Sequence, residues 1–218
     1  MIRENFEKNI AELQSKFVEM VDSTAEQIEL AFQALKNQDV ELALRVIDND
    51  VYIDDLENEI NQMAIWFMAK EQPVARDLRR IVSFIKISAG IERIGDFSVN
   101  ISKSTILIGT TPSLLDLSTL EIMKNTCIIM MKKAKDAFVT ENIALAKEVG
   151  DLDDKVDEMK KENYQKLTKY LAEHPDQTEQ LVQMLFINRY LERIADHVTN
   201  MAESTAYLIK GQIYDFNQ

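Results

Sequence analysis

The sequence predicts an all-α protein made of two tandem, pseudo-symmetric three-helix bundles. Three observations support this fold class. The chain has only 5 glycines and 3 prolines in 218 residues, whereas an average chain of this length carries about 26 such residues. Apolar residues recur at spacings of three and four over long stretches, which is the pattern of amphipathic helices. A nine-residue segment is also repeated 100 residues further along the chain.

Three long helices are predicted in the first half. The first spans about residues 3–35, because apolar side chains recur at helical spacing from Phe6 to Leu35. The second begins after Asp39, whose carboxylate can cap a helix, and ends near residue 71. The third spans about residues 73–108, because the missing N–H of Pro73 costs nothing in a first turn.

Three further helices are predicted in the second half. Ser118 and Glu121 match a capping box for the fourth helix, which ends near residue 139. Thr140 can cap the fifth helix, which ends near residue 173. Pro175 starts the sixth, and Gly211 ends it. A cluster of Gly, Thr, Pro and Ser separates the halves. The predicted units are a first bundle at 1–109, a linker at 110–117, a second bundle at 118–211 and a C-terminal tail at 212–218.

Composition and charge exclude several functional classes. The chain carries 37 acidic against 25 basic residues, a net charge of −12, so it repels a phosphate backbone and nucleic acid is not an expected partner. The single cysteine, Cys127, cannot form an internal disulfide, which favours a reducing compartment. No apolar stretch is long enough to span a membrane, and the N-terminus lacks a signal-peptide core. We expect a cytoplasmic protein that meets membranes only through partners.

The repeated segment keeps its acidic residues in phase. Residues 92–100 read Glu-Arg-Ile-Gly-Asp-Phe-Ser-Val-Asn and residues 192–200 read Glu-Arg-Ile-Ala-Asp-His-Val-Thr-Asn, so five of nine positions are identical. The preceding helices also correspond in pattern, at 50–54 and 153–157. This indicates an internal duplication of a three-helix unit.

The duplicated positions predict metal binding in each half. Two acids and an asparagine spaced i, i+4 and i+8 share one helix face. Carboxylates one turn apart repel each other unless a cation lies between them, and oxygen donors suit Mg²⁺, Ca²⁺, Mn²⁺ or Fe³⁺. The preceding helix adds two aspartates at the same spacing. The predicted metal ligands are Glu92, Asp96, Asn100, Asp50 and Asp54 in the first half, and Glu192, Asp196, Asn200, Asp153 and Asp157 in the second.

Other interpretations of these residues stay open from the sequence. A Glu-Arg-x-x-Asp segment is often a solvated helix face whose arginine neutralises its acids. The Glu-x-x-His pairs of di-iron enzymes are absent, because Leu171 and Ile194 stand three residues before the two histidines. Cys127 lies in an apolar run, which favours a packed core thiol over a nucleophile. The alternatives to a metal-binding regulator are a carboxylate-metal hydrolase or oxidase and a structural bundle without metal.

The sequence resembles the PhoU family. The resemblance rests on Gln72-Pro73-x-Ala75-x-Asp77-Leu78-Arg79, on the repeated motifs at 92–96 and 192–196, and on Tyr207-Leu208-Ile209-Lys210-Gly211. It covers nearly the whole chain. It implies two similar three-helix bundles and a role as the phosphate-transport accessory and regulatory protein of bacteria.

The resemblance also implies a mode of action without catalysis. Family members are cytoplasmic, often dimeric negative regulators of the phosphate-starvation response, which connect the phosphate ABC transporter ATPase to the sensor histidine kinase of a two-component system. Some members bind multinuclear iron or zinc clusters, whose ligands here would be Glu92, Asp96, Glu192 and Asp196, with Asn100 and Asn200 also matching the pattern. Gly90 replaces a frequent acid and Ala195 a frequent glycine, and His197 can compensate in the second half.

Overall fold

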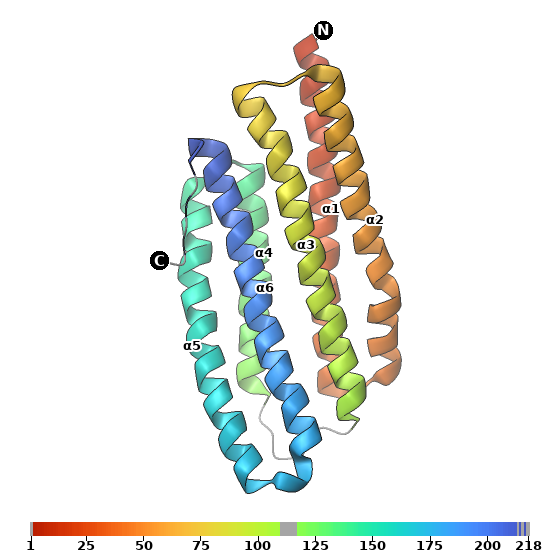
Figure 1. Ribbon diagram of the computed structural model, residues 1–218, viewed down its shortest axis with the longest axis vertical. Coiled ribbons are helices and arrows are strands. Elements are labelled where there is room, and N and C mark those ends of the chain that lie inside the picture. Colours follow the sequence, from red (N-terminus) through yellow and green to blue (C-terminus); the bar gives the residue numbers. More distant parts are fainter. Residues whose placement is uncertain (1, 110–116, 213, 215, 217–218) are drawn as a thin grey trace.

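Six long α-helices run along the length of the molecule in this computed structural model, which describes residues 2–109, 117–212, 214 and 216 (Figure 1). A short 3₁₀ turn, Pro175–Gln177, precedes the last helix, and no strand occurs in the described residues. The predicted all-α fold class is confirmed. The predicted linker lies outside the described residues except for Leu117, as do positions 213, 215, 217 and 218 of the predicted tail. The helices are α1 Ile2–Asn37, α2 Val40–Glu71, α3 Ala75–Ile108, α4 Ser118–Val139, α5 Ile143–Glu173 and α6 Thr178–Lys210.

Two of the predicted helix-end residues act as expected. The Asp39 side chain accepts a 2.9 Å hydrogen bond from the Leu42 N–H and caps α2. Gly211 ends α6 in a left-handed conformation with φ of 70°, which glycine adopts without the steric penalty of a Cβ.

Four predicted helix starts are wrong. Asn142, not Thr140, caps α5, because the extended backbone of Asn142 lets its side chain accept from the first helical N–H groups, whereas Thr140 still has α-helical dihedrals. Leu117 takes the cap position of α4, so Ser118 is the first residue of the helix rather than its cap. Pro73 precedes α3, which begins at Ala75, and Pro175 opens the 3₁₀ turn rather than α6.

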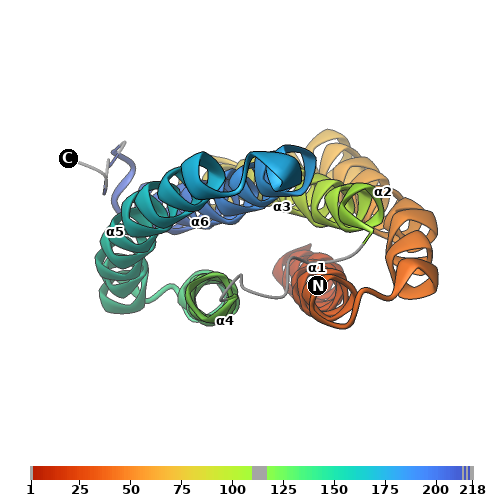
Figure 2. The same cartoon turned by 90° about the horizontal axis from the view of Figure 1, so that it is seen from below.

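The helices form two layers. Seen end-on, α2, α3, α6 and α5 make a curved outer layer, and α1 and α4 lie side by side on its concave side (Figure 2). At the centre of the outer layer α3 and α6 run antiparallel. Phe97 stacks on Tyr190 with ring centroids 6.0 Å apart, and two turns further along α3 Ser104 donates to Gln183 across 3.0 Å. The repeated motifs of the two halves therefore face each other across this helix pair.

One hydrophobic core joins the two halves. Phe17 of α1, Phe84 of α3 and Phe138 of α4 pack edge-to-face with centroids 4.8 to 5.7 Å apart, so an aromatic cluster crosses the boundary between the repeats. Ion pairs between α1 and α4 reinforce it, and one of them joins the buried Lys124 to Glu29. The two repeats thus fold as one body on which the acidic motifs have fixed positions.

Candidate functional site: two acidic clusters

Acids from α2 and α3 gather in the first half. We call Asp50, Asp54, Glu57, Glu92 and Asp96 the first acidic cluster. A groove between the two helices is lined by Asp54, Glu57, Asn58, Ala89, Glu92 and Arg93. The helices approach closely beside this groove, because a Cβ added to Gly95 would lie 3.1 Å from Asp50 Oδ1. The sequence places a glycine where α2 and α3 need one.

The electrostatics of the first acidic cluster disfavour its charged state. Burial raises the pKa of Asp50, and the neighbouring Asp54 and Asp96 add to that rise. Burial and then Asp96 raise the pKa of Glu92. Arg93 offsets part of this repulsion, since its Nη1 donates to Asp96 Oδ2 across 2.9 Å and its Nε lies 3.4 Å from Glu92 Oε2. The cluster retains an excess of carboxylates over cations.

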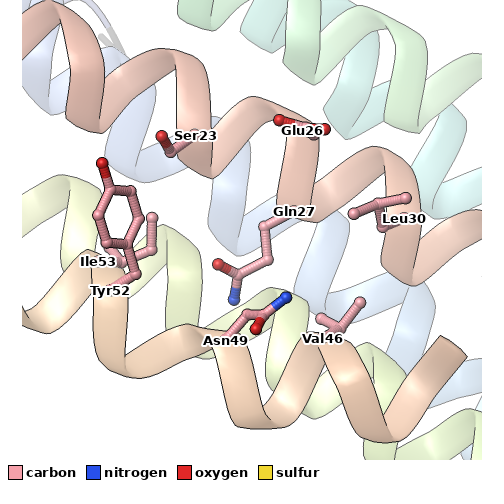
Figure 3. A pocket seen from close by; sticks show the side chains of 8 residues that line it. All are labelled: Ser23, Glu26, Gln27, Leu30, Val46, Asn49, Tyr52 and Ile53. Atoms are coloured by element: carbon pink, nitrogen blue, oxygen red, sulfur yellow. The ribbon is translucent and has the colours of Figure 1, made fainter. Parts of the chain in front are cut away.

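A pocket lies between α1 and α2, and one of its lining residues, Gln27, contacts the first acidic cluster. Figure 3 shows its lining side chains, with Gln27 extending from α1 toward Asn49 on α2. Gln27 is buried, and its Nε2 donates to Asp50 Oδ1 across 2.8 Å. This hydrogen bond favours the charged form of Asp50 and so opposes the effect of burial on its pKa.

Acids from α5 and α6 form a matching group in the second half. We call Asp153, Asp157, Glu192 and Asp196 the second acidic cluster. Asp153 is 8% exposed. Burial, followed by repulsion from Asp196 and Asp157, raises its pKa to about 7, while a hydrogen bond to Thr199 opposes the rise. Burial and then Glu192 raise the pKa of Asp196.

The motif glutamate of the second acidic cluster has one more basic partner than that of the first, where Lys103 instead acts on Asp50. Arg193 repeats the role of Arg93, with Nη1 2.9 Å from Asp196 Oδ2 and Nε 3.6 Å from Glu192 Oε2. Lys160 adds a further cation, because its Nζ donates to Glu192 Oε1 across 2.5 Å. Glu192 Oε2 is buried and accepts no hydrogen bond from the described residues. One oxygen of a mostly buried carboxylate therefore lacks a hydrogen-bond donor.

The remaining predicted residues lie at the edges of these clusters. Asn100 is half-buried and Asn200 exposed, one turn beyond the acids on α3 and α6. His197 lies against Phe97, with ring centroids 5.7 Å apart. Burial, Arg193 and Arg93 lower its pKa, which keeps it neutral at pH 7. Cys127 is fully buried, burial raises its pKa to about 12, and its Sγ contacts the Leu191 carbonyl. The prediction of a packed core thiol is confirmed.

The donor chemistry of both clusters fits a hard cation. All donors are carboxylate or amide oxygens, the ligands that Mg²⁺, Ca²⁺ and Mn²⁺ prefer, and Glu192 Oε2 is available for a further partner. However, within the described ranges no three Asp, Glu, His or Cys side chains are already arranged to hold a metal ion. The hydrogen bonds from Arg93 to Asp96 and from Arg193 to Asp196 account for this, because they orient one carboxylate of each cluster toward a guanidinium.

Several residues of the clusters were missed by the sequence prediction. Glu57 and Lys160 follow Asp54 and Asp157 by three positions, so helical spacing alone could have placed them on the same faces. Gln27 comes from a different helix and has no signal in the sequence near Asp50.

The part of the chain that the structure describes contains no helix long and apolar enough to cross a membrane.

Comparisons with known proteins agree with this architecture. The family model described as the PhoU domain matches the chain twice, at residues 17–105 and 120–205. A curated relative from Clostridium acetobutylicum, named phosphate-specific transport system accessory protein PhoU homolog, is 37% identical over the whole of both chains. A relative with the same name from Aquifex aeolicus is 35% identical, covering 94% of this chain and 93% of its own. The crystal structure of PhoU from Pseudomonas aeruginosa superposes with a TM-score of 0.90 at 29% identity, covering 95% of this chain and all of that one. This chain belongs to the PhoU family.

Proposed function

We propose that this protein is an accessory and regulatory component of a phosphate-specific transport system. The observation that carries the proposal is the pair of PhoU domains, which match residues 17–105 and 120–205. The name of the Clostridium acetobutylicum relative gives that role, and the relative matches this chain from end to end. No part of the relative lacks a counterpart here, so transfer of the role needs no additional domain.

The proposed action is negative regulation of the phosphate-starvation response. The protein would act in the cytoplasm, as a homodimer, by contacting the ATPase of the phosphate ABC transporter and the sensor histidine kinase. Phosphate status would change which of these complexes is populated. Binding rather than turnover is supported by the side chains present: the Cys127 thiol is buried with a pKa of about 12, and both arginines of the motifs are paired with carboxylates.

The proposed ligands of the protein are metal ions held by the acidic clusters. The acids Asp50, Asp54, Glu92 and Asp96 would hold a cation between α2 and α3, and Asp153, Asp157, Glu192 and Asp196 would hold one between α5 and α6. Asn100 and Asn200 would complete the sets from the next turn. A bound divalent or trivalent ion, or an iron or zinc cluster, supplies positive charge that these carboxylates lack. The carboxylates would then tie neighbouring helices together rather than repel.

A phosphate-starvation promoter reporter in phosphate-rich medium tests the regulatory role. We expect high output in a strain lacking this protein and every other copy of the family, and low output when the wild-type protein is supplied. Asp96→Ala/Asp196→Ala should fail to restore repression if the clusters matter. The matched control is Asp55→Ala/Glu158→Ala, which removes two exposed acids from α2 and α5. Persistent repression in the deletion strain would overturn the regulatory proposal.

Two measurements on the purified protein address the alternatives. Metal-dependent turnover of a phosphoester would favour a carboxylate-metal hydrolase. A melting temperature that does not change on chelation, together with no bound metal, would favour a structural bundle whose acids are merely solvated.

A further inference from the structure

The two acidic clusters differ at one corresponding position. Asp50 and Asp54 of α2 correspond to Asp153 and Asp157 of α5, at a separation of 103 residues. The same separation relates Glu57 to Lys160. The first half therefore has a carboxylate where the second half has an ammonium group, on the same face of the equivalent helix.

The side chains around this position differ in the same direction. The groove beside Glu57 is lined by Asn58 on α2 and Ala89 on α3. The corresponding residues of the second half are Lys161 on α5 and Arg189 on α6, and both are exposed. The duplication has thus kept the acids of the repeated motif, but the residues around them are more positively charged in the second half.

Lys160 is held in place against the motif. Its Nζ lies 2.5 Å from Glu192 Oε1, and Arg193 Nε lies 3.6 Å from Oε2 of the same carboxylate. The Glu192 side chain is only 11% exposed, so solvent screens this pair weakly. The Lys160 carbonyl also accepts a 3.0 Å hydrogen bond from Asn188 Nδ2 of α6, which anchors this turn of α5.

The corresponding carboxylate of the first half lacks such a partner. Glu92 Oε2 lies 3.4 Å from Arg93 Nε, and Glu57 and Asp54 line the same groove. Glu92 therefore faces one cation of the chain and three further carboxylates, those of Asp96, Asp54 and Glu57. Glu192 faces two cations of the chain. A cation from solution gains more in the first acidic cluster, because there it meets charge that the chain leaves unbalanced.

We infer that the Lys160 ammonium takes the place of a metal ion in the second acidic cluster, so that a soluble divalent cation binds the first acidic cluster in preference to the second. This inference rests on the proposed metal binding and assigns the preferred metal site to the first half of the molecule. The two repeats would then differ in function: α2 and α3 respond to the cation, whereas α5 and α6 keep one arrangement.

Titration of the chelator-treated, full-length protein with Mn²⁺, followed by electron paramagnetic resonance of the free ion, tests the inference. The wild-type protein should bind Mn²⁺. Asp96→Ala should weaken the affinity for Mn²⁺ by about tenfold or more, whereas Asp196→Ala should change it by less than about twofold. Lys160→Gln and Lys160→Glu should each gain a second binding event, which the added change Asp196→Ala removes. The control Lys161→Glu alters the charge of the exposed neighbour of Lys160 and should gain none.

The reciprocal change tests the first half. Glu57→Lys should lose the Mn²⁺ binding of the wild type, whereas Asp55→Lys, a change of equal charge on an exposed position of α2, should retain it. In the absence of metal, Lys160→Met should lower the melting temperature and Glu57→Lys should raise it. These two results would show that a lysine at this position stabilises the neighbouring carboxylates when no metal is bound. Circular dichroism confirms that each variant folds.

The outcomes separate this inference from the proposal beneath it. Mn²⁺ binding that depends equally on Asp96 and Asp196, or mainly on Asp196, would overturn the inference while metal binding stands. Lys160 variants without a second binding event would overturn it as well. If neither the wild type nor any variant binds Mn²⁺, Fe²⁺ or Zn²⁺, the metal proposal fails and this inference fails with it.

Discussion

The two halves of the molecule hold corresponding aspartates, the half-buried Asp50 and the buried Asp153, by different means. Asp50 accepts a hydrogen bond from Gln27, a residue of α1 that reaches across to α2. Asp153 has Thr199 of α6 as its favourable partner and is repelled by Asp196 and Asp157, and its pKa rises to about 7. The same residue type at equivalent positions is therefore subject to different influences on its pKa.

The halves also differ at one position of the repeated motif. A Cβ added to Gly95 of α3 would lie 3.1 Å from Asp50 Oδ1 of α2, whereas Ala195 stands at the corresponding position of α6. The duplication kept the spacing of the acids along each helix but not the groups that neutralise or crowd them. Equivalent positions in a duplicated fold are thus no guarantee of equivalent chemistry.

The largest expected effect comes from filling the helix contact of the first half. Gly95→Val should destabilise the protein by about 3 kcal/mol, because a Cβ alone already comes within 3.1 Å of Asp50 Oδ1 and 3.4 Å of Ile53 Cγ2. Urea unfolding measures the change. Gly90→Val is the matched control, since a Cβ there meets nothing within 4 Å. Equal effects at the two glycines would show that the close approach of α2 and α3 is not required.

The second expected effect concerns the pH dependence of the second half. The pKa of Asp153 is about 7 in the folded protein and about 3.9 when unfolded. The folded state therefore binds the proton more tightly, and stability falls as pH rises from about 4 to about 7. The variant Asp153→Asn lacks this titrating group, so its stability relative to wild type should increase with pH. In metal-free protein, the difference in free energy of unfolding between variant and wild type should be about 2 kcal/mol more favourable to the variant at pH 8 than at pH 5.

Thermal unfolding of both proteins across this pH range provides the measurement. Asp50→Asn is the counterpart in the first half and should show a weaker pH dependence, because Gln27 stabilises the Asp50 carboxylate. Parallel stability curves for wild type and Asp153→Asn would contradict the raised pKa.

A smaller effect should follow from removing the amide that supports Asp50. Gln27→Met deletes the buried donor and should cost about 1 kcal/mol, while the pKa of Asp50 rises further and approaches the behaviour of Asp153. Urea unfolding and a carboxyl titration by NMR give the two readouts. Gln33→Met on the exposed side of α1 serves as the control. An unchanged Asp50 titration would mean that the hydrogen bond does not set its charge state.

The smallest expected difference lies between the two motif arginines. Arg93→Ala should destabilise metal-free protein by about 0.5 kcal/mol more than Arg193→Ala. Glu92 loses the chain cation that faces it, whereas Glu192 keeps Lys160. The gap should shrink at high salt, because Arg93 is exposed and its ion pairs are screened. A larger loss of stability for Arg193→Ala than for Arg93→Ala would contradict this expected difference between the two halves.

Much of the fold was predictable from local sequence. The helices have the predicted lengths because amphipathic spacing and the scarcity of glycine and proline act within a single segment. Caps were less predictable: Asn142 displaced Thr140 as the cap of α5, since the choice depends on which residue adopts extended dihedrals. The two Glu-Arg-Ile motifs lie on the third and sixth helices as predicted, but the pairing of these two helices was not predicted. The arginine–aspartate pairs of the motifs were only one of the possibilities that the sequence left open.

The sequence by itself determined the six helices, the duplication and the helix faces that carry the acids, because these follow from periodicity along one segment. Only the tertiary structure decided which groups meet across helices: Gln27 with Asp50, Lys160 with Glu192, and the Phe17–Phe84–Phe138 contact that joins the halves. The physical reason is that the charge state of a carboxylate depends on burial and on neighbours a few ångströms away. Those neighbours are set by the rotation and packing of whole helices. The local sequence around each carboxylate does not indicate which residues of other helices will lie beside it.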